Sequence, residues 1–501
     1  MRTVPGRTDH VVVVGAGLAG LSAALRLAGA GRRVTVLERD ADVGGRCGRL
    51  QLAGYTFDTG PTVLTMPDLI ADALACVGER IEDRLDLVRL DPAYRSHHAD
   101  GSVLDVRADP DDMAAHVREV CGVADADGYR RWVRFVTALY AAEMRTFIDR
   151  NLDSPLDLVR PDLFRLALLG GFRRLAPRIE TFVRDERLRR LLSFQAMYAG
   201  LSPYDALAIY AVIAYMDCVA GVFAPRGGLH AVPRALAAAA SDHGVEIHCG
   251  TGVSRLVTSA GRAVAAETED GSRIAADAFV LTPDLPVAHR LLLGSTPRRV
   301  AGQTYSPSCL LLLAGSGRAV GTAQHEIHLG RAWQQTFAEV IDRGQLMSDP
   351  SFLVSRLSLS EPALAPVGRH AYTVLFPAPN ARAPIDWSRV GPRYRDEVLA
   401  VLAARGYDDL DVLDVTTPAD WAARGLEAGT PFAAAHTFRQ TGPFRAPNLS
   451  RAVENVVFAG SGTTPGVGIP MVLVSGRLAA ERITGPDPSY RSRARRPLPR
   501  R

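Results

Sequence analysis

Lysine is absent from this 501-residue chain, so all 58 of its basic side chains are arginines. Genomic base composition accounts for the deficit, because alanine, glycine, arginine and proline are all abundant. Schiff-base enzymes, pyridoxal-phosphate enzymes and P-loop NTPases each need a lysine ammonium at one fixed position. The missing lysine therefore excludes these three classes of enzyme.

Cysteines and long apolar runs are scarce as well. The six cysteines form no CxxC pair and no compact cluster, which speaks against a zinc site or a disulfide scaffold and favours reduced, cytosolic thiols. The apolar run Val11 to Val14 is too short for the core of a signal peptide, so we expect no export. With 47% hydrophobic and 22% charged residues, neither a disordered chain nor a multispanning membrane protein is indicated.

Positive charge is concentrated at the end of the chain. The formal net charge is +4, but residues 491–501 hold six arginines and no acid, so the remainder carries −2. This pattern predicts a basic, disordered tail over residues 486–501, and contact of the tail with anionic lipid or nucleic acid is the alternative.

A glycine-rich turn follows the first predicted strand. Val11 to Val14 read as a buried parallel strand, and an amphipathic helical run covers Leu21 to Leu27. Between them, Gly15 permits a tight turn, Gly17 lets the backbone approach a pyrophosphate, and Gly20 lets the helix lie close to the strand. The amides and the dipole at the start of the helix would attract the phosphates.

A second predicted strand, Arg33 to Leu37, ends at Glu38. Glu38 comes 23 residues after Gly15, where a carboxylate accepts hydrogen bonds from the adenosine ribose and disfavours a 2′-phosphate. Strand, turn, helix and acid together predict an adenine dinucleotide site. Its predicted contacts are Gly15, Ala16, Gly17, Leu18, Ala19, Gly20, Glu38 and Arg39.

A second glycine pair separates FAD from NAD. Gly44-Gly45-Arg46 follows Glu38 after a short loop, and the segment Tyr55 to Thr62 comes soon after. An arginine beside the first turn suits bidentate contact with a pyrophosphate that stays bound, although a plain surface arginine is the alternative. These residues resemble the FAD-binding domain of the amine-oxidase-like flavoproteins. The resemblance adds Gly44, Gly45, Arg46, Gly60, Pro61 and Thr62 to the expected FAD contacts.

The far end of the chain narrows the family. Residues 455–483 read as a strand, a turn rich in glycine and proline, and a helix that starts near Met471. This segment resembles the signature of bacterial and fungal phytoene desaturases, in which it closes over the ribityl chain and the flavin ring. Ser461 stands where related flavoproteins usually carry an acid. The resemblance implies contacts from Gly460, Ser461, Gly468, Ile469, Pro470 and Met471.

The middle of the chain is similar to the same family, so the resemblance covers about residues 10–483. A helix is expected from Pro225-Arg226-Gly227-Gly228-Leu229 through Ala240, and Val253 resembles the position whose backbone meets the adenine. Alternation around Asp270-Gly271 predicts a hairpin of Ala263 to Glu269 with Arg273 to Val280.

The fold class that follows is α/β: a Rossmann-type FAD-binding domain like that of glutathione reductase, an α+β substrate domain, and a helical membrane-associated region. We divide the chain into a first FAD-binding part at 1–75, a helical membrane-facing substrate part at 76–225, a second FAD-binding part with the hairpin at 226–300, a substrate domain at 301–445, a third FAD-binding part at 446–485 and the tail at 486–501.

Residues 160–190 alternate basic and apolar side chains at helical spacing, with nine arginines against four acids. From the residues alone, a helix in a lipid interface and the solvated face of a helical bundle fit equally well. The family's long polyene substrate, which must leave a bilayer, favours the membrane. We therefore expect a cytoplasmic protein attached peripherally to the inner face of the cell membrane.

One acid follows an apolar segment. Ala206 to Met216 predicts a helix that is apolar nearly all round, either plain core or the lining of a tunnel. Asp217, next to it, is the candidate catalytic residue, as proton acceptor or as stabiliser of a cation, although a surface or salt-bridged aspartate fits the pattern as well. His325 and the pair His97-His98 are further candidates, each with a structural alternative.

The resemblance implies a FAD-dependent desaturase that converts phytoene to lycopene, with FAD re-oxidised by oxygen or a quinone. Flavin N5 would take a hydride while a proton leaves the neighbouring carbon. The alternatives are a related desaturase or ketolase that acts on a later carotenoid, and a non-catalytic prenyl-binding protein of the same fold, against which the intact glycine motifs argue. No metal-ligand set, Ser-His-Asp order or nucleic-acid module is recognised.

Overall fold

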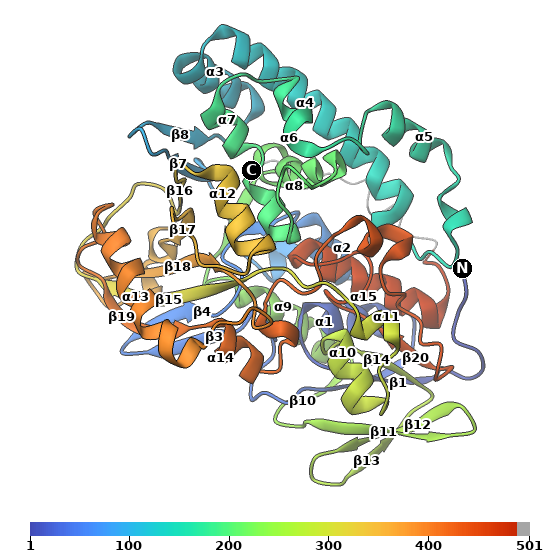
Figure 1. Ribbon diagram of the computed structural model, residues 1–501. Helices are drawn as coiled ribbons and strands as arrows, with labels where there is room; N and C mark the ends of the chain where they lie inside the picture. Colours follow the sequence, from blue (N-terminus) through green and yellow to red (C-terminus); the bar gives the residue numbers. More distant parts are fainter. Residues whose placement is uncertain (488–501) are drawn as a thin grey trace.

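The computed structural model describes residues 1–487, apart from the side chains of residues 145, 146 and 155. A five-stranded parallel sheet lies at the centre of one half of the molecule (Figure 1). Its strands, in spatial order, are β10 (Glu246–His248), β2 (Arg33–Leu37), β1 (His10–Val14), β14 (Ala278–Leu281) and β20 (Val456–Phe458). The two N-terminal strands predicted from the valine-rich runs are confirmed. The predicted basic tail lies beyond residue 487, outside the described part of the chain, except for residues 486 and 487.

Both faces of this sheet are covered, which explains its continuous apolar strands. Val11 and Val13 on β1 pack into a core with the helices α1 (Leu18–Gly29), α9 (Ala231–Asp242) and α15 (Ile469–Thr484). Val12 and Val14 face the opposite side and join a second core. Because successive side chains of a strand point to opposite faces, one run of four valines contributes to both cores.

The predicted hairpin is only half right. β12 (Arg262–Thr268) pairs with β13 (Arg273–Ala275) and with β11 (Val253–Ser259) in a small antiparallel sheet. The strand expected to continue to Val280 ends at Ala275, and residues 278–281 belong to β14 of the parallel sheet instead. The Asp277 amide donates to the His10 carbonyl, which directs the chain onto β1.

The other half of the molecule contains a seven-stranded sheet, antiparallel except where β16 pairs with β7. Its strands in spatial order are β19 (Asp411–Thr416), β15 (Ser308–Ser316), β18 (His370–Ala378), β17 (Phe352–Ser355), β16 (His325–His328), β7 (Tyr94–His97) and β8 (Val103–Val106). Helices α12 (Trp333–Phe337), α13 (Trp387–Ala403) and α14 (Pro418–Ala423) accompany it.

Two small sheets and three short helices complete the α/β part. β3 (Arg49–Leu52) pairs with β4 (Tyr55–Asp58), and β9 (Val222–Pro225) lies between β5 (Leu64–Thr65) and β6 (Leu87–Arg89). The short helices are α2 (Asp68–Ala75), α10 (Leu285–Val287) and α11 (Arg298–Ala301). Along the chain, β5 follows the first glycine motifs and β9 precedes α9.

A helical layer lies at the end of the molecule opposite the β11–β13 sheet (Figure 1). It contains α3 (Pro110–Cys121), α4 (Val123–Glu143), α5 (Pro161–Leu168), α6 (Leu175–Glu180), α7 (Glu186–Leu191) and α8 (Ala211–Tyr215). The helical spacing of residues 160–190 therefore gives three short helices, not one. The apolar segment 206–216 is also broken, into a 3₁₀ turn at Ala208–Tyr210, α8, and a π-helix, η6 (Met216–Ala220), which contains Asp217.

Candidate cofactor cradle and active site

The glycines of the first turn have three different surroundings. Gly15 has a φ of +103°, and a Cβ there would overlap the Thr282 hydroxyl. A Cβ on Gly20 would overlap the Gly15 carbonyl oxygen, so α1 can lie against β1 only with glycine at this position. Gly17 differs, because the nearest atom to a Cβ at this position would be the Gly44 carbonyl oxygen at 3.8 Å. Gly17 thus leaves space for a ligand, whereas Gly15 and Gly20 serve the close packing of the turn.

Glu38 lies at this turn as the sequence predicts. Its carboxylate is 5% exposed and accepts hydrogen bonds from the amides of Ala16 at 2.7 Å and Asp40 at 3.0 Å. The Thr251 amide donates to the Glu38 carbonyl oxygen at 2.7 Å, which brings the start of β11, and with it Val253, to the same place. Each carboxylate oxygen accepts one of these two hydrogen bonds, so each keeps a lone pair for a ribose hydroxyl.

The second glycine pair rests directly on the first turn. The Gly44 amide donates to the Ala16 carbonyl oxygen at 2.9 Å, and a Cβ on Gly45 would lie 3.3 Å from the Cα of Gly17. A Cβ on Gly60 would overlap the carbonyl oxygen of Arg46, so the segment Gly60-Pro61-Thr62 is held against the same loop. The three predicted glycine motifs are thus neighbours in space.

Arg46 connects this loop to two distant segments. One Nη donates to the Ser461 hydroxyl at 2.7 Å, and the other makes an ion pair with Asp284 at 2.5 Å. The Arg46 Nε–H is buried without a hydrogen-bond partner among the described residues. An orphaned donor beside the glycine turn can bind an anionic oxygen of a ligand.

The C-terminal segment closes the cradle. α15 begins at Ile469, two residues earlier than predicted, directly after Gly468 with a φ of +105°. A Cβ on Gly476 would overlap the Ala19 carbonyl oxygen, so α15 lies in backbone contact with the start of α1. The Ser475 hydroxyl accepts from the Gly460 amide at 3.0 Å and fixes the turn after β20. The start of α1, with its positive dipole end at the first glycine turn, is therefore held against the middle of α15.

The remaining predicted contacts have mixed positions. Leu18, Ala19, Ile469 and Pro470 are buried beside the cradle, and Met471 is partly buried against the same core. Arg39 points elsewhere: its side chain is 60% exposed and donates to the Arg424 carbonyl oxygen.

The cradle fits FAD on three observations. Gly17 leaves an open approach, the buried Glu38 carboxylate has only neutral donors, and Arg46 keeps a free Nε–H among the described residues. Gly17 and Arg46 suit a pyrophosphate, and Glu38 suits an adenosine ribose.

Asp217 lies inside the protein on η6, which packs against β5 and β9. Its side chain is 5% exposed, and its Oδ2 has no hydrogen-bond partner among the described residues. Burial raises the pKa of Asp217 to about 7, and polar contacts from Gln195 and Tyr94 partly offset this shift. A buried carboxyl that titrates near neutral pH can take up and release a proton during a reaction.

Of the three candidate histidines, His325 is the one that lies near both the cradle and Asp217. Its Nδ1 is 2.9 Å from the Ser355 hydroxyl, which donates at 3.1 Å to the hydroxyl of Thr62 in the cradle. Its ring lies 5.7 Å from that of Tyr94, the neighbour of Asp217. Burial lowers the pKa of His325 to about 3, so the ring is neutral at physiological pH.

His97 is the last residue of β7, and His98 follows it directly. His97 contacts the buried carboxylate of Glu326, and His98 contacts the Ser96 hydroxyl at 3.2 Å. Among the contacts of the described residues, neither histidine reaches the cradle, which favours the structural alternative for this pair.

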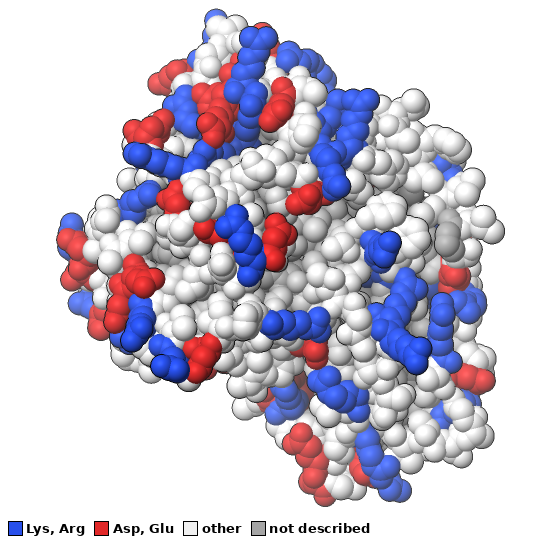
Figure 2. All heavy atoms as spheres, in the orientation of Figure 1, with Lys and Arg blue, Asp and Glu red and all other residues white. Residues whose placement is uncertain are grey.

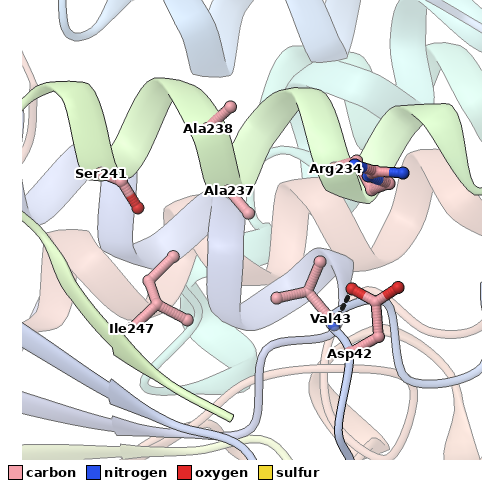
Figure 3. A pocket seen from close by; sticks show the side chains of 7 residues that line it. All are labelled: Asp42, Val43, Arg234, Ala237, Ala238, Ser241 and Ile247. Carbon is pink, nitrogen blue, oxygen red and sulfur yellow. Dashed lines mark hydrogen bonds between the residues drawn. The ribbon is translucent and has the colours of Figure 1, made fainter.

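A surface hollow lies next to the loop that carries the second glycine pair (Figure 3). The Val43 amide there donates to the Asp42 carboxylate at 2.8 Å. Because the lining contains none of the predicted cofactor contacts, we do not count the hollow as part of the cradle. It is lined by Asp42, Val43, Arg234, Ala237, Ala238, Ser241 and Ile247.

Several site residues carry no signal in the sequence. Asp284, Tyr94 and Gln195 belong to no cofactor motif, and their partners Arg46 and Asp217 are far away along the chain. Asp284 comes shortly after the end of a predicted strand, where ligand sites of parallel sheets are expected, and this position is the one hint that the sequence offers.

Comparisons with known proteins show the family and the fold of the chain. The family model of the flavin containing amine oxidoreductases matches residues 18–484. The chain is 57% identical to a phytoene dehydrogenase of Streptomyces griseus, over 97% of both chains. It is 36% identical to a zeta-carotene-forming phytoene desaturase of Myxococcus xanthus, over 95% of this chain and 93% of the relative. An oxidoreductase structure from Methanosarcina mazei matches 93% of this chain and 99% of its own at a TM-score of 0.64 and 17% identity, which shows the fold.

Proposed function

The chain belongs to the flavin containing amine oxidoreductase family, and we propose that it uses FAD to desaturate phytoene to lycopene. At the coarser level it is a flavoprotein of the phytoene desaturase type, as its relatives over nearly the whole chain indicate. The finer step, the product lycopene, is the proposal. The zeta-carotene-forming relative makes the number of desaturation steps the point to test.

One observation carries the proposal: the cradle adjoins an apolar interior that contains a titratable carboxyl. β5, which follows Thr62, lies against the π-helix that contains Asp217. The core around Asp217 consists of aliphatic and aromatic side chains from the helical layer and the seven-stranded sheet. Such surroundings favour a hydrocarbon over a charged substrate, because burying apolar surface supplies the binding free energy.

Desaturation removes a hydride and a proton from neighbouring carbons of the substrate. When bound, the flavin supplies the hydride acceptor. Asp217 accepts the proton at Oδ2, the carboxylate oxygen without a partner among the described residues, while the nearby Tyr94 hydroxyl orients the carboxyl. The water-poor surroundings keep the reacting carbons away from solvent. Oxygen or a quinone then takes the two electrons, which completes the turnover.

The decisive experiment incubates FAD-loaded protein with phytoene in liposomes, with oxygen or with a quinone. Absorption spectra and chromatography of the extracted carotenoids report how many conjugated double bonds form. We expect lycopene. Accumulation of zeta-carotene as the end product would contradict the lycopene proposal and leave the desaturase assignment intact.

Two other outcomes separate the alternatives. If phytoene stays unchanged while a more unsaturated carotenoid is consumed, the chain acts later in the pathway. If the purified protein has no flavin absorption band even after addition of FAD, it is a prenyl-binding protein of the same fold.

We also propose that the helical layer attaches the protein to a membrane. α5 and the neighbouring loops expose large apolar side chains: Leu168 is 90% exposed, Leu156 77%, and Phe164 and Val159 64% each. Figure 2 shows an expanse of surface with few charged atoms on the side where Figure 1 draws α5. Among the described residues, no helix is long and apolar enough to span a bilayer. Insertion of one helical face fits these observations.

Only part of the arginine cluster is free to serve such a surface. Arg165 and Arg173 are exposed beside these apolar side chains. Arg178 instead lies over the rings of Phe135 and Phe182, and Arg187 and Arg190 pair with Asp185 and Glu186. The proposed membrane surface therefore covers residues 156–174, and we place the protein peripherally at the inner face of the cell membrane. Cell fractionation with a tagged protein tests this location.

A further inference from the structure

Arg445 holds a buried positive charge without a counter-ion among the described residues. Its side chain is 2% exposed, and the guanidinium donates to backbone carbonyl oxygens. Nε donates to Thr463 at 3.0 Å, one Nη to Ser461 at 2.6 Å and Ala434 at 3.3 Å, and the other Nη to Gln440 at 3.2 Å. In the part of the chain that the structure describes, no carboxylate pairs with it.

The groups around Arg445 leave its charge uncompensated. Burial lowers the pKa of Arg445 to about 10, so the guanidinium stays protonated at neutral pH. Burial raises the pKa values of Tyr210 and Tyr305, the two phenols that act on it, so neither supplies a negative charge. His436 is partly buried and neutral, because desolvation holds its pKa well below the usual range. A lone buried charge is costly, and four carbonyl dipoles offset only part of that cost.

The position of this charge points to the cofactor. Ser461 and Thr463 belong to the turn between β20 and α15, the segment that closes the cradle. Arg46 contacts the same turn through the Ser461 hydroxyl, but Asp284 pairs with Arg46 and cancels its charge. Of the two guanidinium groups at this turn, Arg445 is thus the one that contributes a net positive potential.

We propose that Arg445 tunes the bound flavin electrostatically, its unpaired charge behind the Ser461–Thr463 turn stabilising the negative charge of the reduced ring. Uptake of two electrons and one proton turns the neutral oxidised ring into an anion, and the electrons come from the substrate or from a reducing dye. A fixed cation in a poorly solvated site favours that anion. The proposal rests on flavin binding and not on the identity of the substrate.

The test measures the two-electron midpoint potential of the holoenzyme by equilibration with a reference dye, without carotenoid. Arg445→Gln removes the charge, and we expect the equilibrium constant for reduction to fall about ten- to hundredfold, or about 30–60 mV for a two-electron couple. Arg445→Lys keeps the charge but loses the planar fork, and its potential should stay near that of the wild type even if the protein is less stable.

Arg482→Gln is the matched control. Arg482 is 1% exposed as well, but it pairs with Asp153 near the end of α15. Its replacement should leave the potential unchanged. A potential that is unchanged in flavin-loaded Arg445→Gln, or that shifts equally in the Gln and Lys variants, would overturn the proposal and leave Arg445 a structural residue.

A measurement on the wild type keeps the proposal testable if Arg445→Gln does not fold. The reduced holoenzyme should show the absorption spectrum of the anionic flavin at pH values where free reduced flavin is protonated at N1. A neutral reduced flavin at those pH values would contradict the proposal. Because neither readout needs turnover, failure here is distinct from failure of the desaturase assignment.

Discussion

At the scale of single residues, Gly17 and Gly20 separate cofactor binding from folding. A Cβ on Gly17 would meet only ordinary contacts, whereas one on Gly20 would overlap the Gly15 carbonyl oxygen. We expect Gly17→Leu to fold but to lose FAD, because its side chain fills the approach of the pyrophosphate. Gly20→Ala should instead lower the free energy of unfolding by about 1–3 kcal/mol through overpacking.

Flavin absorbance after purification, FAD titration and circular dichroism of the two apo-proteins check this pair. A Gly17→Leu protein that keeps its flavin and its activity would show that the glycine turn is not the pyrophosphate site.

The second prediction concerns Asp217 and the pH dependence of the reaction rate. Asp217 can accept a proton only in its ionised form. The rate of flavin reduction by substrate should therefore rise with pH through about 7, the pKa of Asp217, and then level off. Asp217→Asn should abolish this inflection and slow the step by about 10²–10⁴-fold. Rapid-mixing absorbance across the pH range measures both effects. Asp408→Asn, at a side chain 56% exposed, is the control and should keep the wild-type profile.

The pKa of Asp217 also sets how the stability of the protein changes with pH. The folded-state pKa of Asp217 lies above its unfolded value, so between about pH 4 and 7 the folded protein binds more protons and its free energy of unfolding falls as pH rises. Asp217→Asn should flatten that fall. A variant with an unchanged activity profile but a flattened stability profile would make Asp217 a structural residue only.

Sequence reasoning at this scale succeeds where function needs a short motif. Gly15, Gly17, Gly20 and Glu38 follow from the spacing of one strand, turn and helix, and the structure brings them together. The pairing of Arg46 with Asp284 depends instead on contacts between segments 238 residues apart, which no local spacing encodes. The carbonyl partners of Arg445 lie within 18 residues of it along the chain, but they belong to irregular turns that no sequence period encodes.

At the scale of elements, the spacing of apolar residues predicts a strand correctly where the whole segment belongs to one sheet. It fails where parts of the segment join different sheets or where the segment is apolar on every side. Val11 to Val14 are apolar throughout because both faces of β1 are covered. The segment 273–280 alternates like one strand, yet its halves join two different sheets. The segment 206–216 is apolar all round, so it carries no period from which its 3₁₀, α and π turns could be derived.

The prediction at this scale concerns the binding of α5 to a membrane. Phe164→Gln with Leu168→Gln should weaken binding to vesicles at least about tenfold, because each fully buried large apolar side chain contributes about 1.5–3 kcal/mol. Co-sedimentation with phosphatidylcholine vesicles, with and without phosphatidylglycerol, measures the loss. Arg165→Gln with Arg173→Gln should weaken binding to the anionic vesicles alone, by about 1 kcal/mol per arginine.

Val367→Gln with Leu359→Gln is the matched control, since these side chains are 104% and 43% exposed but belong to the segments that precede β18. Equal binding of the α5 variant and this control would show that α5 does not enter the membrane.

At the scale of the whole molecule, the cradle is assembled from segments that span nearly the entire chain. Residues 15–62 supply the glycine motifs, Val253 follows β10, and residues 460–471 close the site behind β20. The parallel sheet makes this possible, because β14 lies between β1 and β20 and so brings the two ends of the chain together. The domain boundaries expected from the sequence stay a prediction.

FAD should therefore stabilise the chain as a whole. The folded protein alone unites the three segments, so FAD binds the folded and not the unfolded state, and at a hundredfold excess over Kd it should add about 2.7 kcal/mol to the free energy of unfolding. Calorimetry of the apo-protein at rising FAD concentrations should show one transition that moves upward. Glu38→Ala should need more FAD for the same shift, because its buried carboxylate no longer accepts from the ribose. Two separate transitions, of which FAD moves only one, would show that the halves of the molecule unfold independently and that the cofactor joins only the segments around the parallel sheet.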